Sequence, residues 1–495
     1  MIGTARLFRR FLSLLGPKLI ATLLAIASTP IIVRLLGPGL YGDYAVLLSI
    51  YSLYMIPISA AITEGVQKFV AEERTGQWAE RVVQFYFFSG FALALFGAVL
   101  LVVATRLGVA DHFGEGFTLY FYLLGLYVFV DQFRGLSMHT VLGFGLEHIS
   151  GPLGVVKKGV TVTAGILLVL AGFGVAGLLV GHIVASVLVA LIAGAVVVRR
   201  LSTRALINPP RSVPYREFLS FNGFNVVLVL LVMSLFHVDV IMVRALVGDE
   251  ATGFYKAALA LAEYIWIVPI VLQGLLLHSS STLWHEERYG ELTELAGRVT
   301  RYTTLLVLLM AVGLAVLAER VVPLYYGEPF AVATTPLLLL LPGAIGFAIA
   351  RPLQAICQGS GKLRTLIFAV GIAAVLNVVL NAVLIPVFGI NGAATATSVS
   401  YGSMFLLLVW SARRLGYDPL VDFRAGRVAV TTVGTAGVIL LADGLFESDL
   451  LALIVVPVVG AVVFTAAALV TGAIDRDELT AIVSQLPLPE RYRSD

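Results

Sequence analysis

Long apolar runs dominate this chain of 495 residues and constrain its fold more than any other feature. An α-helix of about 20 residues crosses the hydrocarbon core of a bilayer, and lipid offers unpaired backbone groups no hydrogen-bond partner. The runs lack the alternation of barrel strands, so we predict an all-α integral membrane protein with about 14 transmembrane helices. The runs lie at 11–36, 42–64, 82–105, 117–139, 150–171, 175–198, 218–246, 253–283, 299–319, 331–357, 363–386, 391–412, 426–443 and 451–473.

The composition agrees with this class and excludes a water-soluble globule. Charged residues make up only 13% of the chain, whereas soluble proteins carry about 25%. The single cysteine, Cys357, excludes a disulfide framework and a cysteine-based metal cluster. The net charge of +3 is too small to indicate a nucleic-acid partner.

The positions of the basic residues predict the orientation, because cytoplasmic loops of membrane proteins collect lysine and arginine. If the N-terminus is cytoplasmic, 28 of the 33 basic residues fall on the cytoplasmic side. The sequence therefore predicts a multi-pass protein of the cytoplasmic membrane with both termini in the cytoplasm. The five basic residues left on the outer side are Arg34, Arg106, Arg244, Lys256 and Arg320.

An internal repeat organises the chain. The segment 31–36 (IIVRLL) recurs as 241–246 (IMVRAL) at an offset of 210, and 173–177 (FGVAG) recurs as 388–392 (FGING) at an offset of 215. The repeat unit holds six predicted helices, an even number, so both copies enter the membrane in the same direction. Transporters use such parallel repeats to build a site between two lobes.

The repeat predicts how the chain is divided. We expect two six-helix lobes joined by a basic cytoplasmic linker, followed by a C-terminal helix pair and a cytoplasmic tail. The boundaries are 1–198 for the N-lobe, 199–216 for the linker, 217–414 for the C-lobe, 415–474 for helices 13 and 14, and 475–495 for the tail.

Several motifs resemble a known family. They are 34–38 (RLLGP) followed by Tyr41-Gly42, Val238-Asp239 leading to 253–255 (GFY), Tyr326-Gly327 with Phe330, and above all 377–397 (NVVLNAVLIPVFGINGAATAT). The chain resembles the polysaccharide transporter (Wzx-like oligosaccharide flippase) branch of the multidrug/oligosaccharidyl-lipid/polysaccharide (MOP) exporter superfamily. The resemblance implies alternating-access transfer of a polyprenyl- or dolichyl-linked oligosaccharide across the membrane.

Cationic side chains inside or beside the spans are candidates for holding the phosphate or pyrophosphate of such a substrate, because charges in lipid often mark pathways. Each also has a plainer interpretation: a snorkelling side chain, a positive-inside residue, a helix-end anchor, or, for Arg134, an i, i+3 pair with Asp131. The candidates are Lys18, Arg34, Arg134, Lys157, Lys158 and Lys256.

A second group of residues suggests coupling or gating. Asp239 and Glu263 are the acids best placed to bind a proton or sodium ion, although a satisfied structural acid is the alternative. Arg244 is a candidate gate at the outer end, although an anchor of the helix end is the plainer interpretation. Asn377 and Asn381 share one helix face, where interhelical hydrogen bonding is the plainer interpretation.

No catalytic motif is evident, and we predict a transporter rather than an enzyme. The sequence lacks a GxxxxGK[ST] phosphate-binding loop, so we expect no cofactor and a proton or sodium gradient as the energy source. Expected partners are the lipid-linked glycan, membrane lipids and the glycosyltransferases or polymerase of the same pathway, and we expect a monomer. The alternatives are a cation-coupled multidrug exporter and a lipid-linked peptidoglycan-precursor flippase.

Overall fold

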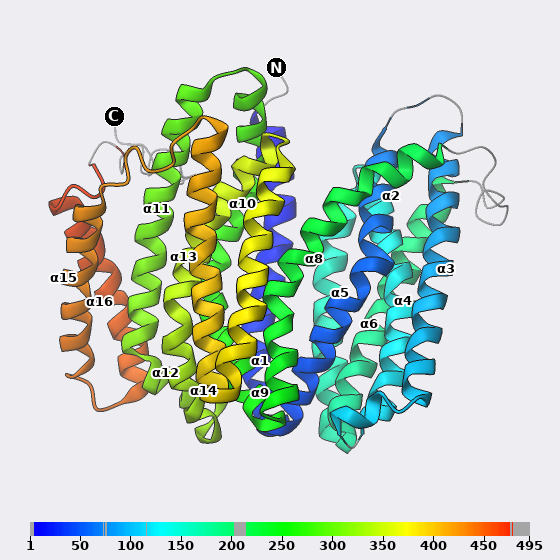
Figure 1. The fold of residues 1–495 in the computed structure, drawn as a ribbon, viewed down its shortest axis with the longest axis horizontal. Helices are drawn as coiled ribbons and strands as arrows, with labels where there is room; N and C mark the ends of the chain where they lie inside the picture. Colours follow the sequence, from blue (N-terminus) through cyan, green and yellow to red (C-terminus); the bar gives the residue numbers. More distant parts are fainter. Residues whose placement is uncertain are drawn as a thin grey trace. The chain divides into compact units, whose positions relative to one another are not determined.

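The computed structural model describes residues 4–72, 74, 77–114, 116–201, 214–475 and 478. Long helices account for most of this part of the chain, with short helical segments at some of their junctions (Figure 1). The long helices are α1 (Thr4–Met55), α2 (Ala61–Ala71), α3 (Trp78–Arg106), α4 (Phe117–Gly143), α5 (Glu147–Leu168), α6 (Gly174–Arg200), α8 (Tyr215–Leu246), α9 (Asp249–Glu263), α10 (Ile267–His285), α11 (Tyr289–Val316), α12 (Ala318–Tyr326), α13 (Thr334–Gly359), α14 (Leu363–Leu415), α15 (Ala425–Asp443) and α16 (Asp449–Val470).

Ten helical stretches of the described residues are long and apolar enough to cross a membrane, so the protein is a multi-pass membrane protein, as predicted. Three of these stretches, Gly16–Ala71, Glu147–Arg200 and Leu363–Leu415, are 53 to 56 residues long and each contains two of the predicted runs. The predicted count of fourteen spans is not confirmed and stays a prediction.

Glycines turn the chain inside the longest stretches. Gly174 has φ 49° and ψ −131°, and Gly389, which is 215 residues further on, has φ 57° and ψ −134°. A side chain would be strained at such positive φ values, so the chain needs glycine at both bends. The two copies of the repeat therefore use the same backbone turn at equivalent positions.

The chain divides into two compact units, one made of Met1–Ala257 with Val370–Ser400 and the other of Ala258–Ala369 with Tyr401–Asp495. The lobes predicted from the repeat stay a prediction. Residues 202–213 of the predicted linker lie outside the described residues, as does the predicted tail apart from Asp475 and Glu478.

Small residues bring helices together in the first unit. A Cβ on Gly181 of α6 would lie 2.7 Å from the backbone nitrogen of Gly165 on α5, so these two helices touch at their backbones. Such contacts drive helix association in lipid, where the hydrophobic effect between helices is absent. An aromatic group around Phe69, Trp78 and Phe218 fills one end of the same unit.

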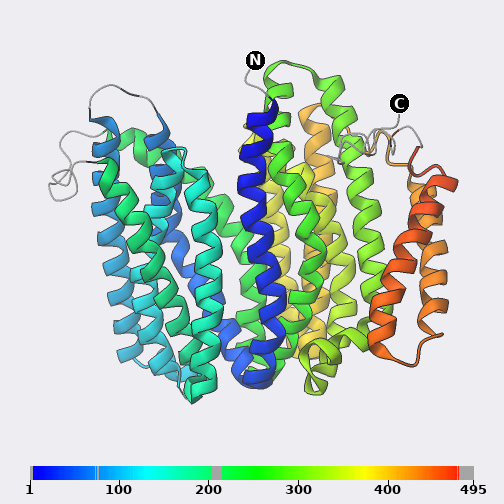
Figure 2. The ribbon, with the colours of Figure 1, turned by 180° about the vertical axis from the view of Figure 1, so that it is seen from behind.

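In the second unit, α15 and α16 lie side by side (Figures 1 and 2). Gly460 of α16 packs under Ile439 of α15. Arg320, beside the start of α12, pairs with Asp443 and Asp449 at the ends of these two helices, at 2.9 and 2.7 Å. These contacts fasten the C-terminal pair to α12.

Candidate functional site

The predicted pair of Asp131 and Arg134 is present on α4. Arg134 Nε lies 2.5 Å from Asp131 Oδ1 and Nη2 lies 2.8 Å from Oδ2, so both atoms donate to one carboxylate. The i, i+3 spacing places both side chains on one face of the helix. An arginine that binds a carboxylate in this two-pronged way is strongly oriented.

Three more donors reach the same carboxylate from other helices. Tyr51 on α1 donates at 2.5 Å, Lys157 on α5 at 3.2 Å and Ser186 on α6 at 2.6 Å. We call Tyr51, Asp131, Arg134, Lys157 and Ser186 the Asp131 cluster. It joins four helices of the first unit, and its two cations and one anion give a formal charge of +1.

Aromatic side chains extend this cluster. The ring of Tyr51 stacks on that of Tyr127, with centroids 4.2 Å apart, and Tyr127 lies 5.2 Å from the His182 ring. The Tyr44 hydroxyl lies 2.8 Å from His182 Nε2. The polar residues on α1, α4 and α6 thus form one connected group inside the first unit.

A second polar cluster surrounds Asp239, and every member is fully buried. Asp239 Oδ2 accepts hydrogen bonds from the Tyr255 hydroxyl at 2.5 Å and the Thr397 hydroxyl at 3.0 Å. Asn377 Nδ2 donates to Thr397 at 3.3 Å, and Asn381 Nδ2 donates to the Asn377 carbonyl at 2.9 Å. We call these five residues the Asp239 cluster.

The Asp239 cluster has acceptor capacity to spare. The side-chain oxygens Oδ1 of Asn377 and Asn381 are buried and accept no hydrogen bond from the described residues. Unpaired buried acceptors are costly unless a ligand or proton satisfies them. Carboxylate, amide and hydroxyl oxygens are the ligands that hard cations prefer. Among the described residues no three His, Cys, Asp or Glu side chains could hold a metal ion together.

Arg244 makes several contacts at the predicted outer end. It pairs with Asp43 at 2.9 Å, donates to the Phe113 carbonyl and lies over the Phe117 ring. Beside it, Gly42 and Gly253 let α1 and α9 meet at their backbones. The sequence singled out Arg244 as a gate or an anchor, and these contacts suit either role.

The hydrogen bonds and ion pairs described for Asp131 include none of the other predicted cations. Lys18 and Arg34 are exposed on α1, and Lys158 and Lys256 are half-buried. On α1, the hydroxyls of Thr22 and Thr29 donate to the backbone carbonyls of Lys18 and Ala25, one turn earlier.

Glu263, the second predicted acid, lies in the second unit, where it interacts electrostatically with Arg351. Arg351 in turn lies over the rings of Trp266 and Phe347, at 5.1 and 4.9 Å, and donates to Gln273. Arg351 is the repeat equivalent of Arg134, but the part of the chain described around it supplies no hydrogen-bonded carboxylate. The two repeats therefore differ in how this arginine is neutralised.

Sequence reasoning missed several partners in both clusters. Tyr51 and Ser186 lie in no motif, whereas Tyr255 and Thr397 lie in the motifs 253–255 and 377–397 but were not singled out as partners of Asp239. One signal was available, because Tyr44 and Tyr255 occupy equivalent places in the repeat. The hydroxyls of both tyrosines contact a residue on another helix, His182 and Thr397, and these two residues are also equivalent in the repeat, at an offset of 215.

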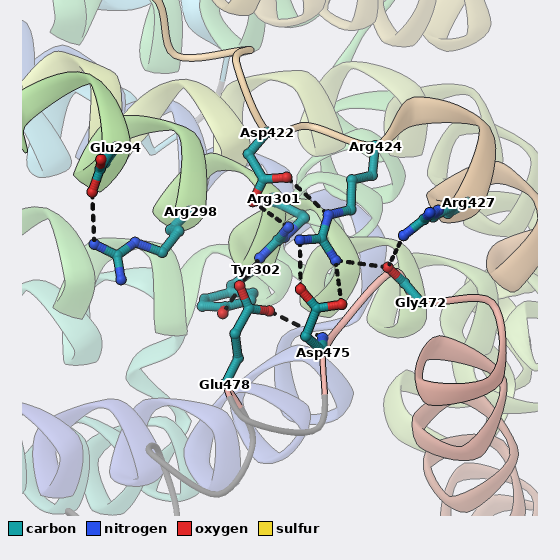
Figure 3. Close-up of polar contacts among 10 residues, drawn as sticks. All are labelled: Glu294, Arg298, Arg301, Tyr302, Asp422, Arg424, Arg427, Gly472, Asp475 and Glu478. Atoms are coloured by element: carbon teal, nitrogen blue, oxygen red, sulfur yellow. Dashed lines mark hydrogen bonds and ion pairs between the residues drawn. The ribbon is translucent and has the colours of Figure 1, made fainter. Parts of the chain in front are cut away.

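A third polar group lies in the second unit, beyond the ends of α15 and α16 (Figure 3). Arg301 of α11 is fully buried and pairs with Asp422 and Glu478. Arg424 pairs with Asp422 and donates to both oxygens of Asp475, at 2.9 and 2.7 Å. This group fastens the segments before α15 and after α16 to α11, a structural task.

The ion pair between Arg424 and Asp475 should make the thermal stability of the protein depend on pH in the acidic range. The Arg424 guanidinium holds the pKa of Asp475 below its usual value, so the stabilisation is present above about pH 4 and is lost as the pH falls through the lowered pKa. We expect the Tm in detergent to fall below pH 4 by about 2 °C more in the wild type than in Asp475→Asn. Equal acid-induced losses in both proteins would show that the pair contributes nothing.

Comparison with known proteins agrees with this architecture. A family model described as polysaccharide biosynthesis protein matches residues 31–335. The probable low-salt glycan biosynthesis flippase Agl15 of Haloferax volcanii is 21% identical over 376 residues, which are 74% of this chain and 75% of that protein.

Two solved structures share the fold. The lipid II flippase MurJ in an inward closed conformation gives a TM-score of 0.76 at 13% identity and covers 92% of this chain and 97% of its own. An inward-facing multidrug resistance MATE family transporter of the MOP superfamily gives a TM-score of 0.66 at 16% identity. The match covers 80% of this chain and 94% of that transporter. The all-α membrane fold is thus confirmed, and because the family model spans more than half of the sequence, the chain belongs to the polysaccharide biosynthesis protein family.

Proposed function

We propose that the protein is a flippase that carries a lipid-linked oligosaccharide across the cytoplasmic membrane by alternating access, for the synthesis of a surface polysaccharide or glycan. The observation that carries this proposal is the Asp131 cluster, a site of net positive charge held inside a membrane unit. Family membership and the likeness to Agl15 support it. The protein acts as a transporter and catalyses no covalent step.

In this proposal, Arg134 and Lys157 attract the phosphate or pyrophosphate of the substrate while its lipid tail stays in the bilayer. Charged hydrogen bonds to phosphate are strong where little water screens them. The exposed Lys18 and Arg34, together with Lys158 and Lys256, guide the anion towards or away from this site. Both termini face the cytoplasm, and one chain suffices for transport.

The Asp239 cluster supplies the coupling site of this proposal. A monovalent cation or a proton would satisfy the buried Asp239 carboxylate and the unpaired Asn377 oxygen. Its binding would tie together α8, α9 and α14, which carry these side chains. Ion binding on one side of the membrane would thereby favour one arrangement of these helices.

Asp239→Asn tests the coupling directly. We expect this variant to flip substrate at a rate that no longer changes with an imposed sodium or proton gradient, whereas the wild-type rate rises about tenfold. Parallel flipping assays in proteoliposomes with each gradient identify the ion. Asp111→Asn, the same change at an exposed residue of the short helical segment Ala110–Phe113, should keep the wild-type response. Gradient dependence that survives in Asp239→Asn would place coupling elsewhere.

Reconstitution with three labelled substrates tests the function itself. We expect proteoliposomes to flip a polyprenyl pyrophosphate-linked oligosaccharide, and to move neither a lipid-linked peptidoglycan precursor nor a cationic drug at a comparable rate. Preference for the precursor would favour a peptidoglycan-precursor flippase. Drug export without glycan flipping would favour the multidrug exporter.

A further inference from the structure

We propose that Asp131 is an internal counter-anion, which partly neutralises Arg134 and Lys157 in the empty site and sets how tightly they hold the phosphate of the substrate. This inference rests on the proposed function and assigns a positioning role to an acidic residue within a cationic site.

The three charged side chains of the Asp131 cluster differ in their exposure to solvent. The Asp131 side chain is only 3% exposed, whereas Arg134 is 21% exposed and Lys157 is 25% exposed. The acid is therefore more deeply buried than the two cations, which keep an accessible surface. An incoming anion would meet the cations first and would compete with Asp131 for them.

The hydrogen-bonding capacity of Asp131 is fully used, whereas that of the two cations is not. A carboxylate offers about four lone-pair sites, and Asp131 already accepts five hydrogen bonds. The cations are not saturated in the same way. Within the described residues, Arg134 Nη1 makes no hydrogen bond and Lys157 uses one of its three donors. The cations therefore have donors left with which to begin binding a phosphate before they release the carboxylate.

Two neutral hydrogen-bond donors lower the attraction between Asp131 and the two cations. The hydroxyls of Tyr51 and Ser186 share the negative charge of Asp131, and this weakens its pull on Arg134 and Lys157. The cations can then shift between carboxylate and phosphate with a small change in free energy. Such a balance suits a transporter, which must bind its substrate and also release it.

The test measures the affinity for geranylgeranyl diphosphate in detergent, with geranylgeraniol as the uncharged control. Asp131→Asn removes the competing charge and keeps the shape. We expect its Kd to fall about tenfold, while its flipping of the lipid-linked oligosaccharide slows by a similar factor because release becomes slow. Asp111→Asn, an equivalent change at an exposed residue of the short helical segment Ala110–Phe113, should alter neither value.

A second variant shifts the balance in the opposite direction. Tyr51→Phe with Ser186→Ala strengthens the hold of Asp131 on the cations, so the Kd for the diphosphate should rise about threefold. This double variant decides the question if Asp131→Asn does not fold. An unchanged or lower Kd in the double variant would overturn the proposal.

The outcomes separate this inference from the proposed function. If the wild type binds the diphosphate no better than the alcohol, the cationic headgroup site is wrong and the inference falls with it. If the wild type binds the diphosphate but folded Asp131→Asn binds it equally or more weakly, Asp131 is only structural. In that case the flippase function stands.

Discussion

Replacing Arg134 and Lys157 together by glutamine should lower the rate of flipping about 100-fold, because each lost charged hydrogen bond to the phosphate reduces binding by about tenfold. Both side chains converge on Asp131 from different helices. The measurement is the initial rate with labelled polyprenyl pyrophosphate oligosaccharide in proteoliposomes.

The single variants and one control sharpen this prediction. Arg134→Gln and Lys157→Gln should each lower the rate about tenfold. Arg106→Gln changes an exposed arginine at the end of α3 that lies over the Tyr122 ring, and it should leave the rate unchanged. A double variant that is folded and flips within threefold of the wild type would show that this cluster does not hold the headgroup.

The fold class could be predicted because membrane crossing imposes length and hydropathy on each helix separately. The apolar runs therefore appear in the sequence without knowledge of any neighbour. The bends at Gly174 and Gly389 lie between predicted runs and recur in the repeat. The exact number of spans depends on where a long helix bends and on how deep each part lies, and hydropathy alone does not determine either.

The candidate site was predictable only as far as local spacing reaches. Asp131 and Arg134 lie one turn apart on one helix, so their pairing follows from helical geometry. The partners Tyr51, Lys157 and Ser186 come from three other helices. Which faces of those helices meet is decided by long-range packing, for which a single sequence carries no direct signal.

Equivalent residues of the two repeats contact each other where α1 meets α9, which the sequence did not reveal. A Cβ on Gly42 would lie 2.0 Å from the carbonyl oxygen of Asp249, and one on Gly253 would lie 2.0 Å from that of Pro38. Gly42 and Gly253 are repeat equivalents, as are Pro38 and Asp249, all at an offset of 211. Each glycine thus meets the carbonyl oxygen of the residue that lies four positions before the other glycine. This reciprocal pattern is that of a two-fold interface.

This reciprocity predicts opposite effects for two neighbouring glycines of α1. Alanine at Gly42 would meet a backbone carbonyl that cannot move aside, so we expect a loss of about 3 kcal/mol in stability and flipping near background. Alanine at Gly39 would meet side chains alone, those of Asp249 at 3.3 Å and Glu250 at 3.9 Å. The better helix propensity of alanine should therefore leave stability equal or raised by up to about 1 kcal/mol. Thermal unfolding in detergent and flipping in proteoliposomes measure both, and Gly253→Ala should behave like Gly42→Ala. If alanine were tolerated equally at Gly39 and Gly42, α1 and α9 would not meet at this contact, and the contacts of Arg244 would hold this end of the helices.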